Sequence, residues 1–584
     1  MIGVEGVASR VLRFQAGRLF RRFERAAQDP GAAQAETLLA KIRRNGESDF
    51  GRERGLGGVR SVEDFRRALP VADYSAFEPY IERAKRGEPR ALVGGGERLV
   101  MFAVTSGTYS RPKYIPVTET FLREYQFGWH VWGHAVSVEH LPALEHKALR
   151  IVSSANESTT ESGIPCGAIS GLTAERLPGV MRRRFVPPAE AAGVKHAASR
   201  YYLTGRIAAG GRVSMIVSAN PSSVLSVVHA VDENREGIVR DIRDGTVGDS
   251  WEIPGEIRER VRPFLVPDPE RARALEELIT RTGRLLPKDY WPDLRLVGNW
   301  KGAGCGLMLG RYGEYFGEVP VREIGLLASE GRMSIPVRGD EGSSGVLDIL
   351  SHFFEFIPEE EIESRSPTVL LAQELQSGRN YYILLTTSSG LYRYNIMDLV
   401  RVSGFFGKTP EIEFLGKGHA FSSMTGEKVS EFQVVQGVRE ARDRMDGAES
   451  RGSGWKGLSN GCVFSPMSGD PCGYSLAAER EKGCTRESWR EFLRRFEEHL
   501  GSINVEYRSK RDSGRLAGPV LHVVRPGTFD GMKQKHLAET GGCGEQYKHR
   551  FLVGEVDYWK RLPVEETVRL GEEDAETLRK RLRT

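Results

Sequence analysis

A short run of hydroxyl-bearing residues carries the first recognisable chemistry in this chain. Residues 104–113 read Val-Thr-Ser-Gly-Thr-Tyr-Ser-Arg-Pro-Lys and follow an apolar run that is typical of a strand. Backbone N–H groups, the hydroxyls of Thr105, Ser106 and Thr108, and the ammonium group of Lys113 make a suitable cradle for an anion such as a phosphate. A surface turn rich in serine and threonine explains the same run equally well, so both interpretations stay open at this point.

Two acidic residues offer chemistry that complements a phosphate loop. Glu330 follows Ser329, and one carboxylate beside a hydroxyl can hold Mg²⁺ on bound phosphates, although a solvated loop glutamate is the simpler interpretation. Asp398 ends a turn-like run that begins at Thr386. An aspartate there can accept hydrogen bonds from two ribose hydroxyls, or it can simply cap the segment that begins at Leu399.

Other patterns are weaker. Residues 404–409 read like the end of a phosphate-binding loop, but Val402 stands where the first glycine is required. His130 and His134 share a helix face without a third ligand at a recognisable spacing, so metal binding there is not expected. Lys548 lies in the run Gly-Glu-Gln-Tyr-Lys-His-Arg (544–550), where a lysine is exposed by default.

Alternating strands and helices must position these residues. Helix-like patterns dominate residues 1–95 and 118–141, and from residue 148 to 415 short apolar runs alternate with helical stretches. Such alternation predicts an α/β architecture. The expected strands cover residues 99–104, 149–152, 213–217, 294–297, 346–349 and 381–385.

A glycine- and serine-rich patch suggests where the chain divides. We expect a large domain over residues 1–415, a hinge over 416–426 and a smaller α+β domain over 427–584. In the smaller domain, the pattern predicts a strand at 520–524 and charged helices at 487–500 and 564–582.

Composition excludes several classes of protein. The chain has 584 residues, with 83 basic and 79 acidic ones, so its net charge of +4 lacks the excess expected of a nucleic-acid binder. Its six cysteines form no Cys-x-x-Cys pair, which argues against a disulfide scaffold and a structural zinc site. No apolar run reaches the length that a membrane-spanning helix needs. Residues 1–26 are rich in arginine but include Glu5 and Glu24, which favours a docked amphipathic helix over a transit peptide. A cytoplasmic, monomeric protein that binds neither membrane nor nucleic acid is expected.

The ordered set of motifs resembles that of adenylate-forming enzymes, the superfamily of acyl-CoA synthetases and firefly luciferase. More closely, the chain resembles the auxin-responsive acyl-acid amido synthetase (Gretchen Hagen) family and its bacterial relatives. The resemblance covers nearly the whole chain and rests on residues 50–52, 71–74, 80–83, 105–118, 162–165, 220–222, 241–245, 353–358, 390–394, 422–428 and 546–548.

The resemblance implies a role for each candidate residue. Thr105, Ser106, Thr108 and Lys113 would lie in the phosphate loop of an ATP site. Glu330, next to Ser329, would lie near Mg²⁺ and the α-phosphate. Asp398 would hold the ribose hydroxyls.

The resemblance also implies two lysines beyond the large domain. Lys428 would approach the nucleotide after the hinge, and Lys548, on a mobile small domain, would stabilise negative charge as pyrophosphate leaves. The chain departs from the family at Tyr109 and in the motif before Ser329. There Leu326 replaces the tyrosine that would stack on adenine, and Leu327 replaces a glycine.

The implied function is a ligase that needs ATP and Mg²⁺. It would adenylate a carboxylic acid and transfer the acyl group to an amino acid or related amine, with release of AMP and pyrophosphate. Two alternatives stay open: an acyl-adenylating enzyme with a thiol or other acceptor, and a catalytically degenerate nucleotide-binding relative. An apolar acyl pocket could be lined by Phe127, Trp129, Trp132 and residues 353–356, although these fit a plain core better.

Overall fold

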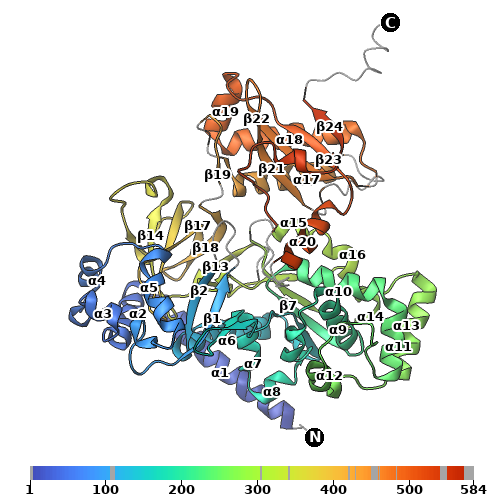
Figure 1. The fold of residues 1–584 in the computed structure, drawn as a ribbon, viewed down its shortest axis with the longest axis horizontal. Helices are drawn as coiled ribbons and strands as arrows, with labels where there is room; N and C mark the ends of the chain where they lie inside the picture. Colours follow the sequence, from blue (N-terminus) through green and yellow to red (C-terminus); the bar gives the residue numbers. More distant parts are fainter. Residues whose placement is uncertain are drawn as a thin grey trace. The chain divides into compact units, whose positions relative to one another are not determined.

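The computed structural model divides the chain into two compact units, each described here by itself (Figure 1). Of the described residues, the larger unit takes those up to Leu415 except Gly306–Arg311, and the smaller unit takes Gly306–Arg311 together with those from Gly416 onward. The hinge expected over residues 416–426 stays a prediction. The structure describes residues 4–105, 112–302, 305–339, 342–418, 421–425, 427, 429–448, 458, 461–481, 483–539 and 549–570.

The larger unit contains a parallel sheet. Its strand order is β6 (Phe185–Val186), β3 (Lys147–Arg150), β7 (Val213–Ser218), β8 (Leu296–Asn299) and β9 (Val321–Glu323). Every residue of β7 is buried, because helices cover a parallel sheet on both faces. Figure 1 shows α9 and α10 beside β7. The helices of this region are α8 (Gly179–Arg182), α9 (Ala197–Ala209), α10 (Pro221–Glu233), α11 (Arg235–Asp244), α12 (Gly255–Val261), α13 (Pro269–Thr282), α14 (Pro287–Tyr290) and α16 (Tyr312–Phe316). α15 (Cys305–Leu309) belongs to the smaller unit from Gly306 onward.

A second sheet of the larger unit carries the hydroxyl-rich run. Its strand order is β2 (Lys113–Thr118), β1 (Leu99–Thr105), β5 (Pro165–Gly167) and β4 (Ser158–Thr159), with α7 (Ile169–Glu175) following β5. β1 and β2 are antiparallel, and Thr105 pairs with Lys113 where the strands meet the intervening loop. The two ends of that loop are therefore fixed side by side.

The third sheet has seven strands and carries Asp398. Its order is β12 (Ser334–Ile335), β13 (Ser344–Leu347), β18 (Thr409–Lys417), β17 (Tyr394–Phe406), β16 (Asn380–Thr386), β14 (Phe353–Pro358) and β15 (Leu370–Leu371). All six residues of β14 are buried. The run at 404–409 that looks like a phosphate-binding loop spans the end of β17, the turn at Gly407 and Lys408, and the start of β18, so it is ordinary hairpin structure.

Helices cover the sheets of the larger unit. α1 (Val4–Ala26) packs along α6 (Glu119–Glu139), where Phe20 lies 4.9 Å from the ring of His134 and Phe23 is fully buried. These contacts show that α1, over Val4–Ala26, is a docked helix. None of the described helices is both long and apolar enough to cross a membrane. The remaining N-terminal helices are α2 (Pro30–Asn45), α3 (Asp49–Glu53), α4 (Val62–Ala68) and α5 (Glu78–Lys85).

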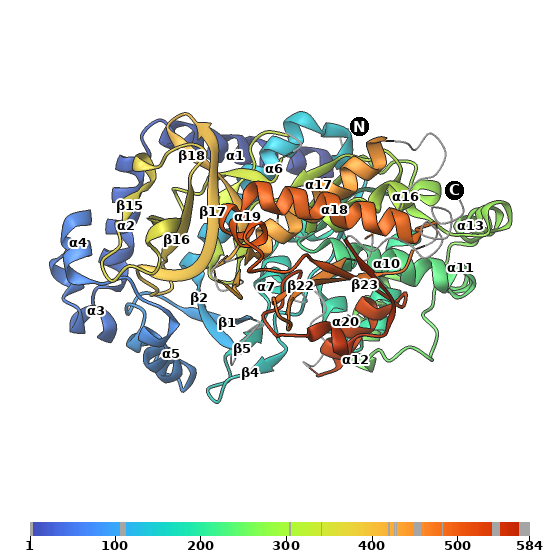
Figure 2. The same ribbon diagram turned by 90° about the horizontal axis from the view of Figure 1, so that it is seen from above.

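The smaller unit has its own sheet and hydrophobic core. The sheet order is β21 (Cys462–Met467), β22 (Gly473–Glu479), β23 (Val520–Val524) and β24 (Val564–Arg569). α18 (Arg486–Ile503) buries Trp489, Phe492, Leu493, Phe496 and Leu500, which recur at helical spacing on one face. Figure 2 shows α18 running beside α17 (Glu431–Ala448). The other elements are β19 (Phe421–Ser422), β20 (Val429–Ser430), α19 (Val505–Asp512) and α20 (Thr528–Glu539).

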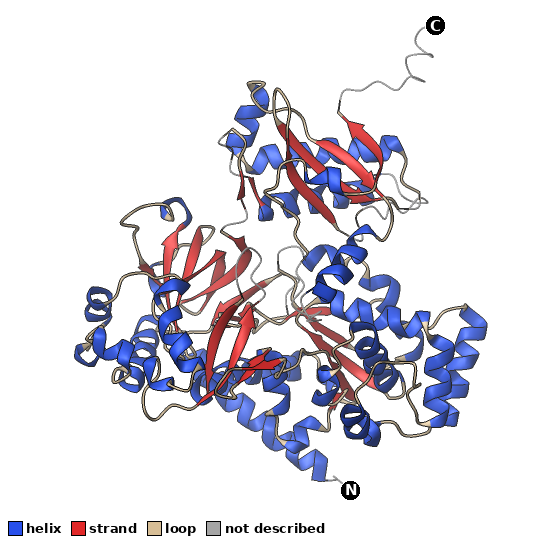
Figure 3. Cartoon of the chain, in the orientation of Figure 1, coloured by secondary structure: helices blue, strands red, loops and turns tan. Residues whose placement is uncertain are grey.

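The mixture of helices and sheets confirms the expected α/β class (Figure 3). The helix expected over residues 564–582 is wrong in its first part, because Val564–Arg569 forms strand β24. This segment pairs antiparallel with β23, and Glu566 forms ion pairs with Arg480 and Arg486. The sheet edge therefore accommodates a charge-rich sequence, whereas residues 571–584 lie outside the described residues.

Candidate active site

The β1–β2 hairpin places a lysine beside two phenols. The Nζ of Lys113 lies 3.4 Å from the Oη of Tyr394 in β17 and donates a hydrogen bond to it. The same ammonium lies 5.5 Å from the ring centre of Tyr74 and 6.0 Å from that of Tyr394, within the range of cation–π attraction. Ser106 and Thr108 lie in the loop at 106–111, outside the described residues. Of the predicted phosphate loop, the structure therefore places Thr105 and Lys113.

Glu330 occupies the tip of a small hairpin. β10 (Leu327–Ala328) pairs antiparallel with β11 (Gly331–Arg332), so Ser329 and Glu330 form the two-residue turn between them. Glu330 is only 8% exposed, which rules out a freely solvated glutamate. No group of three or more His, Cys, Asp or Glu residues with metal-binding geometry occurs in the described ranges. A lone carboxylate suits Mg²⁺, which protein sites commonly bind through one or two carboxylates together with substrate phosphates.

A bulge in the seven-stranded sheet determines the position of Asp398. Tyr382 of β16 pairs with Leu399, and Leu384 pairs with Asn395, so residues 396–398 of β17 lie opposite Ile383 alone. Met397 has a φ of 59°, and its N–H donates to the side chain of Asn395 at 2.8 Å. Asp398 lies within a strand and is 2% exposed, so it is not a helix cap. Bulges of this kind re-aim side chains and are common beside active sites.

Tyr394 connects these three charged residues. Burial raises the pKa of Tyr394 far above its ordinary value, and the negative charges of Glu330 and Asp398 raise it further. The phenol therefore stays protonated and can accept the hydrogen bond from Lys113. Two carboxylates and one ammonium thus share the surroundings of one phenol, although they come from β2, the β10–β11 turn and β17.

The backbone around Tyr394 is held by a buried ion pair. Arg393 Nε donates to Glu355 Oε2 at 2.9 Å, and Arg393 Nη2 donates to Glu355 Oε1 at 3.1 Å. Arg66 adds a second arginine, with Nε 2.9 Å from Glu355 Oε1. Arg393 has a φ of 46°, and its carbonyl accepts from the N–H of Ala72 at 3.1 Å. Paired, hydrogen-bonded charges of this kind can stay buried, and here they fix the start of β17.

Comparison with known proteins settles the family. The GH3 family N-terminal domain matches residues 19–321, the GH3 family central domain matches residues 345–417, and the GH3 family C-terminal domain matches residues 449–556. The chain belongs to the GH3 family. This membership confirms the resemblance to acyl-acid amido synthetases and, with it, the expected ligase class.

Named GH3 relatives match over almost their whole length. The jasmonoyl–L-amino acid synthetase JAR6 of Nicotiana attenuata is 25% identical over 93% of this chain and 94% of its own length. The jasmonoyl–L-amino acid synthetase GH3.5 of Oryza sativa subsp. japonica is also 25% identical, over 90% of this chain and 93% of its own length. Among solved structures, the GH3.15 acyl acid amido synthetase matches with a TM-score of 0.80 at 20% identity, covering 95% of this chain and 97% of its own.

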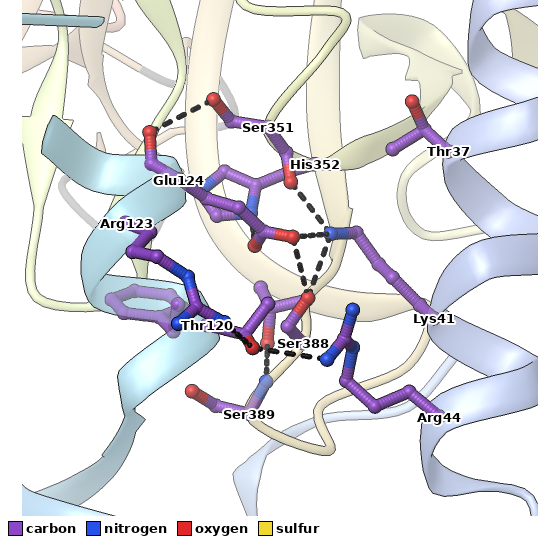
Figure 4. A network of polar contacts seen from close by, with 12 residues as sticks. Thr37, Lys41, Arg44, Thr120, Arg123, Glu124, Ser351, His352, Ser388 and Ser389 are labelled. Atoms are coloured by element: carbon purple, nitrogen blue, oxygen red, sulfur yellow. Dashed lines mark hydrogen bonds and ion pairs between the residues drawn. The ribbon is translucent and has the colours of Figure 1, made fainter. Parts of the chain in front are cut away.

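A polar network lies next to the site in this GH3 chain (Figure 4). The ammonium of Lys41 in α2 donates to Glu124 Oε1 at 2.9 Å and to the carbonyl of Ser351 at 2.6 Å. Ser388 Oγ also donates to Glu124 Oε1, at 2.6 Å. The hydroxyl-rich run at 386–389 therefore includes a structural contact. Sequence reasoning missed Lys41 and Glu124, because residues 83 positions apart on two helices carry no shared pattern.

The two lysines predicted beyond the large domain, Lys428 and Lys548, lie outside the described residues. Glu427, which directly precedes Lys428, is held firmly within the smaller unit. Glu427 accepts from the N–H groups of Met424 and Thr425 at 2.7 and 2.8 Å and from the hydroxyl of Tyr474. Burial opposes ionisation of Glu427, but hydrogen bonds from Tyr474 and the backbone outweigh it, so its pKa is lowered. The charged Glu427 thus fixes the chain immediately before Lys428.

The apolar candidates are mostly core. Trp132 is 4% exposed and donates from Nε1 to the carbonyl of Glu323 at 2.8 Å. Phe127 packs against Phe23, and residues 353–356 are buried within β14. Leu326, where an adenine-stacking aromatic is expected, is buried in the same core, whereas Leu327 is half-buried in β10. The plain-core interpretation therefore fits most of this set.

Proposed function

We propose that this GH3 chain uses ATP to adenylate a carboxylic acid and then transfers the acyl group to an amino acid or related amine. In the first half-reaction, a carboxylate oxygen of the acid attacks the α-phosphorus of ATP, and pyrophosphate leaves. In the second, the amine nitrogen attacks the acyl carbon, AMP leaves, and the nitrogen loses a proton. GH3 membership supports this reaction, as do the names of relatives that join jasmonate to amino acids.

One observation supports the nucleotide site above the others: Lys113, Glu330 and Asp398 all act on Tyr394. Adenylation brings an anionic carboxylate to an anionic triphosphate, so a cation is needed where their charges meet. Lys113 would supply positive charge, with Thr105, Ser106 and Thr108 lining the same loop. Asp398 would accept hydrogen bonds from the ribose hydroxyls.

The donor set around Glu330 also fits Mg²⁺. A single buried carboxylate beside the hydroxyl of Ser329 would hold the ion against bound phosphates. When bound, Mg²⁺ would neutralise phosphate charge. Lys428 and Lys548 are proposed to act from the smaller unit, Lys428 toward the nucleotide and Lys548 toward the departing pyrophosphate.

Product analysis tests the proposed acceptor. Purified protein is incubated with ATP, Mg²⁺, pools of aryl, indolyl and fatty acids, and each amino acid in turn. Mass spectrometry should detect an acyl–amino acid amide together with an equal amount of AMP. An acyl-adenylate that reacts with added thiols and with no amine would overturn amide synthesis while keeping the first half-reaction.

A further inference from the structure

A buried histidine contacts the turn that carries Glu330. His352 immediately precedes β14, has no exposed surface, and its Nε2 accepts a hydrogen bond from the backbone N–H of Arg332 at 3.3 Å. A Cβ atom added to Gly331 would lie only 2.7 Å from the same Nε2. The imidazole therefore fits tightly under the strand residues that directly follow Glu330.

The opposite side of the ring faces a carboxylate. His352 Nδ1 lies 3.9 Å from Glu124 Oε2, while the other oxygen of Glu124 is held by Lys41 and Ser388 (Figure 4). Neither Nδ1 nor Glu124 Oε2 has a hydrogen-bond partner among the described residues. The carboxylate is thus fixed at one oxygen and presents the other toward the imidazole.

These contacts determine which nitrogen of the His352 ring carries the proton. An Nε2 that accepts a hydrogen bond carries no proton, so the neutral ring holds its proton on Nδ1, on the side of Glu124. Burial lowers the pKa of His352 well below its ordinary value, and the positive charge of Lys41 lowers it further. A protonated ring would instead direct an Nε2–H at the N–H of Arg332, which is unfavourable.

The ring has little freedom to move. Its centre lies 5.5 Å from that of Phe121 and 6.1 Å from that of Phe354. The carbonyl of His352 accepts from Gln34 Nε2 at 2.7 Å. Helices α2 and α6 thereby hold the acceptor atom in place under the β10–β11 hairpin.

We propose that His352 is a positioning residue for Glu330: its Nε2 fixes the backbone of β11, and so determines where the Glu330 carboxylate meets Mg²⁺ and the phosphates of ATP. The link to Mg²⁺·ATP rests on the proposed function. The link between His352 and the hairpin rests on geometry alone. Partners that orient a metal-binding residue typically contribute tenfold to a hundredfold to metal affinity or activity.

Three variants test the positioning role. His352→Phe fills the ring space without an acceptor, His352→Gln can return an acceptor oxygen near Nε2, and Phe121→Leu loosens the same packing while leaving the hydrogen bond. Hydrogen–deuterium exchange of the peptide spanning residues 326–334 should show lost protection in His352→Phe, native-like protection in His352→Gln and a small change in Phe121→Leu. Unchanged protection in His352→Phe would overturn the proposal, even if the protein has no measurable activity.

Magnesium dependence tests the consequence for Glu330. In acid-dependent ATP–pyrophosphate exchange, His352→Phe should raise the Mg²⁺ concentration for half-maximal rate about tenfold. The same change made in a Glu330→Gln background should have little further effect, because the carboxylate it positions is gone. Equal effects in both backgrounds would overturn the proposal. If His352→Phe does not fold, Gly331→Ala, whose Cβ displaces the ring, replaces it in both assays.

The two assays separate the two claims. If the native protein shows no ATP–pyrophosphate exchange with any acid, but His352→Phe lowers the hydrogen–deuterium exchange protection of residues 326–334, only the proposed function is contradicted. If the native protein shows ATP–pyrophosphate exchange, but His352→Phe leaves the protection of residues 326–334 unchanged, only the positioning role is contradicted.

Discussion

Lys113 and Tyr394 belong to different sheets, yet the ammonium of the lysine lies 3.4 Å from the phenol oxygen of the tyrosine. This contact joins the end of the β1–β2 hairpin to the strand that carries Asp398. It also brings a cation into a region where burial and two carboxylates act on the same phenol. The account of the site depends on this junction, and the predictions below begin from it.

Lys113→Ala should lower acid-dependent ATP–pyrophosphate exchange by about a hundredfold, because it removes a positive charge from the triphosphate site. The matched control is Lys408→Ala, which removes an exposed lysine from the β17–β18 turn and should leave the rate within twofold of native. Steady-state exchange at saturating ATP is the measurement. Equal exchange rates for the two variants would contradict the assignment of Lys113 to the triphosphate site.

Asp398→Ala should weaken recognition of the ribose more than that of the phosphates. Hydrogen bonds to a charged group contribute about 1.5–3 kcal/mol, so kcat/KM for ATP should fall about tenfold or more. The native protein should discriminate against 2′-deoxy-ATP, and the variant should lose most of that discrimination. The two nucleotides are compared in the exchange assay, and an unchanged ratio would contradict the ribose role.

Arg393→Met should destabilise the larger unit strongly, since it leaves the carboxylate of Glu355, 1% exposed, with Arg66 alone. Breaking a buried ion pair from one side typically costs about 3–5 kcal/mol. Arg66→Met is the control, because its side chain is 29% exposed and Arg393 keeps both bonds to Glu355. Urea unfolding measures both, and a smaller loss for Arg393→Met than for Arg66→Met would refute the assignment.

Asp348 should make stability depend on pH. Burial raises the pKa of Asp348 to about 7, whereas an unfolded aspartate titrates near its ordinary value. Between about pH 4 and 7 the folded state therefore binds a proton that the unfolded state lacks, so this group lowers stability as pH rises, by at most about 1.4 kcal/mol per unit.

The Asp348→Asn variant removes that titration. Its free energy of unfolding, relative to native, should improve from pH 5 to pH 7, as measured by urea unfolding at both values. The same difference at the two pH values would show that Asp348 titrates alike in the folded and unfolded states.

Local sequence patterns were sufficient for much of the fold. The apolar run at 520–524 coincides with β23, and the aromatic helix expected at 118–141 is α6. The failure at 564–569 has a different origin, because charged residues there are neutralised by arginines distant in the chain. The spacing of residues within 564–569 carries no information about such distant partners, so it could not predict an edge strand there.

The candidate site was predictable only in part. Lys113, Glu330 and Asp398 stand in motifs. The structure places the ammonium of Lys113 against the phenol of Tyr394, and the negative charges of Glu330 and Asp398 raise the pKa of that phenol. The roles proposed for them stay predictions, as do those of Ser106, Thr108, Lys428 and Lys548, which the structure does not describe. His352 and Glu124 were not predictable, because their importance depends on a contact between segments more than 200 residues apart.

Acid-dependent ATP–pyrophosphate exchange tests the central claim most directly. Purified protein, ATP, Mg²⁺ and labelled pyrophosphate are combined with pools of aryl, indolyl and fatty acids, with native protein beside Lys113→Ala and Glu330→Gln. The account predicts exchange that requires one acid class and falls about a hundredfold in both variants. Exchange that persists at the native rate in both variants would contradict the site, and no exchange by the native protein with any acid would contradict the adenylation reaction itself.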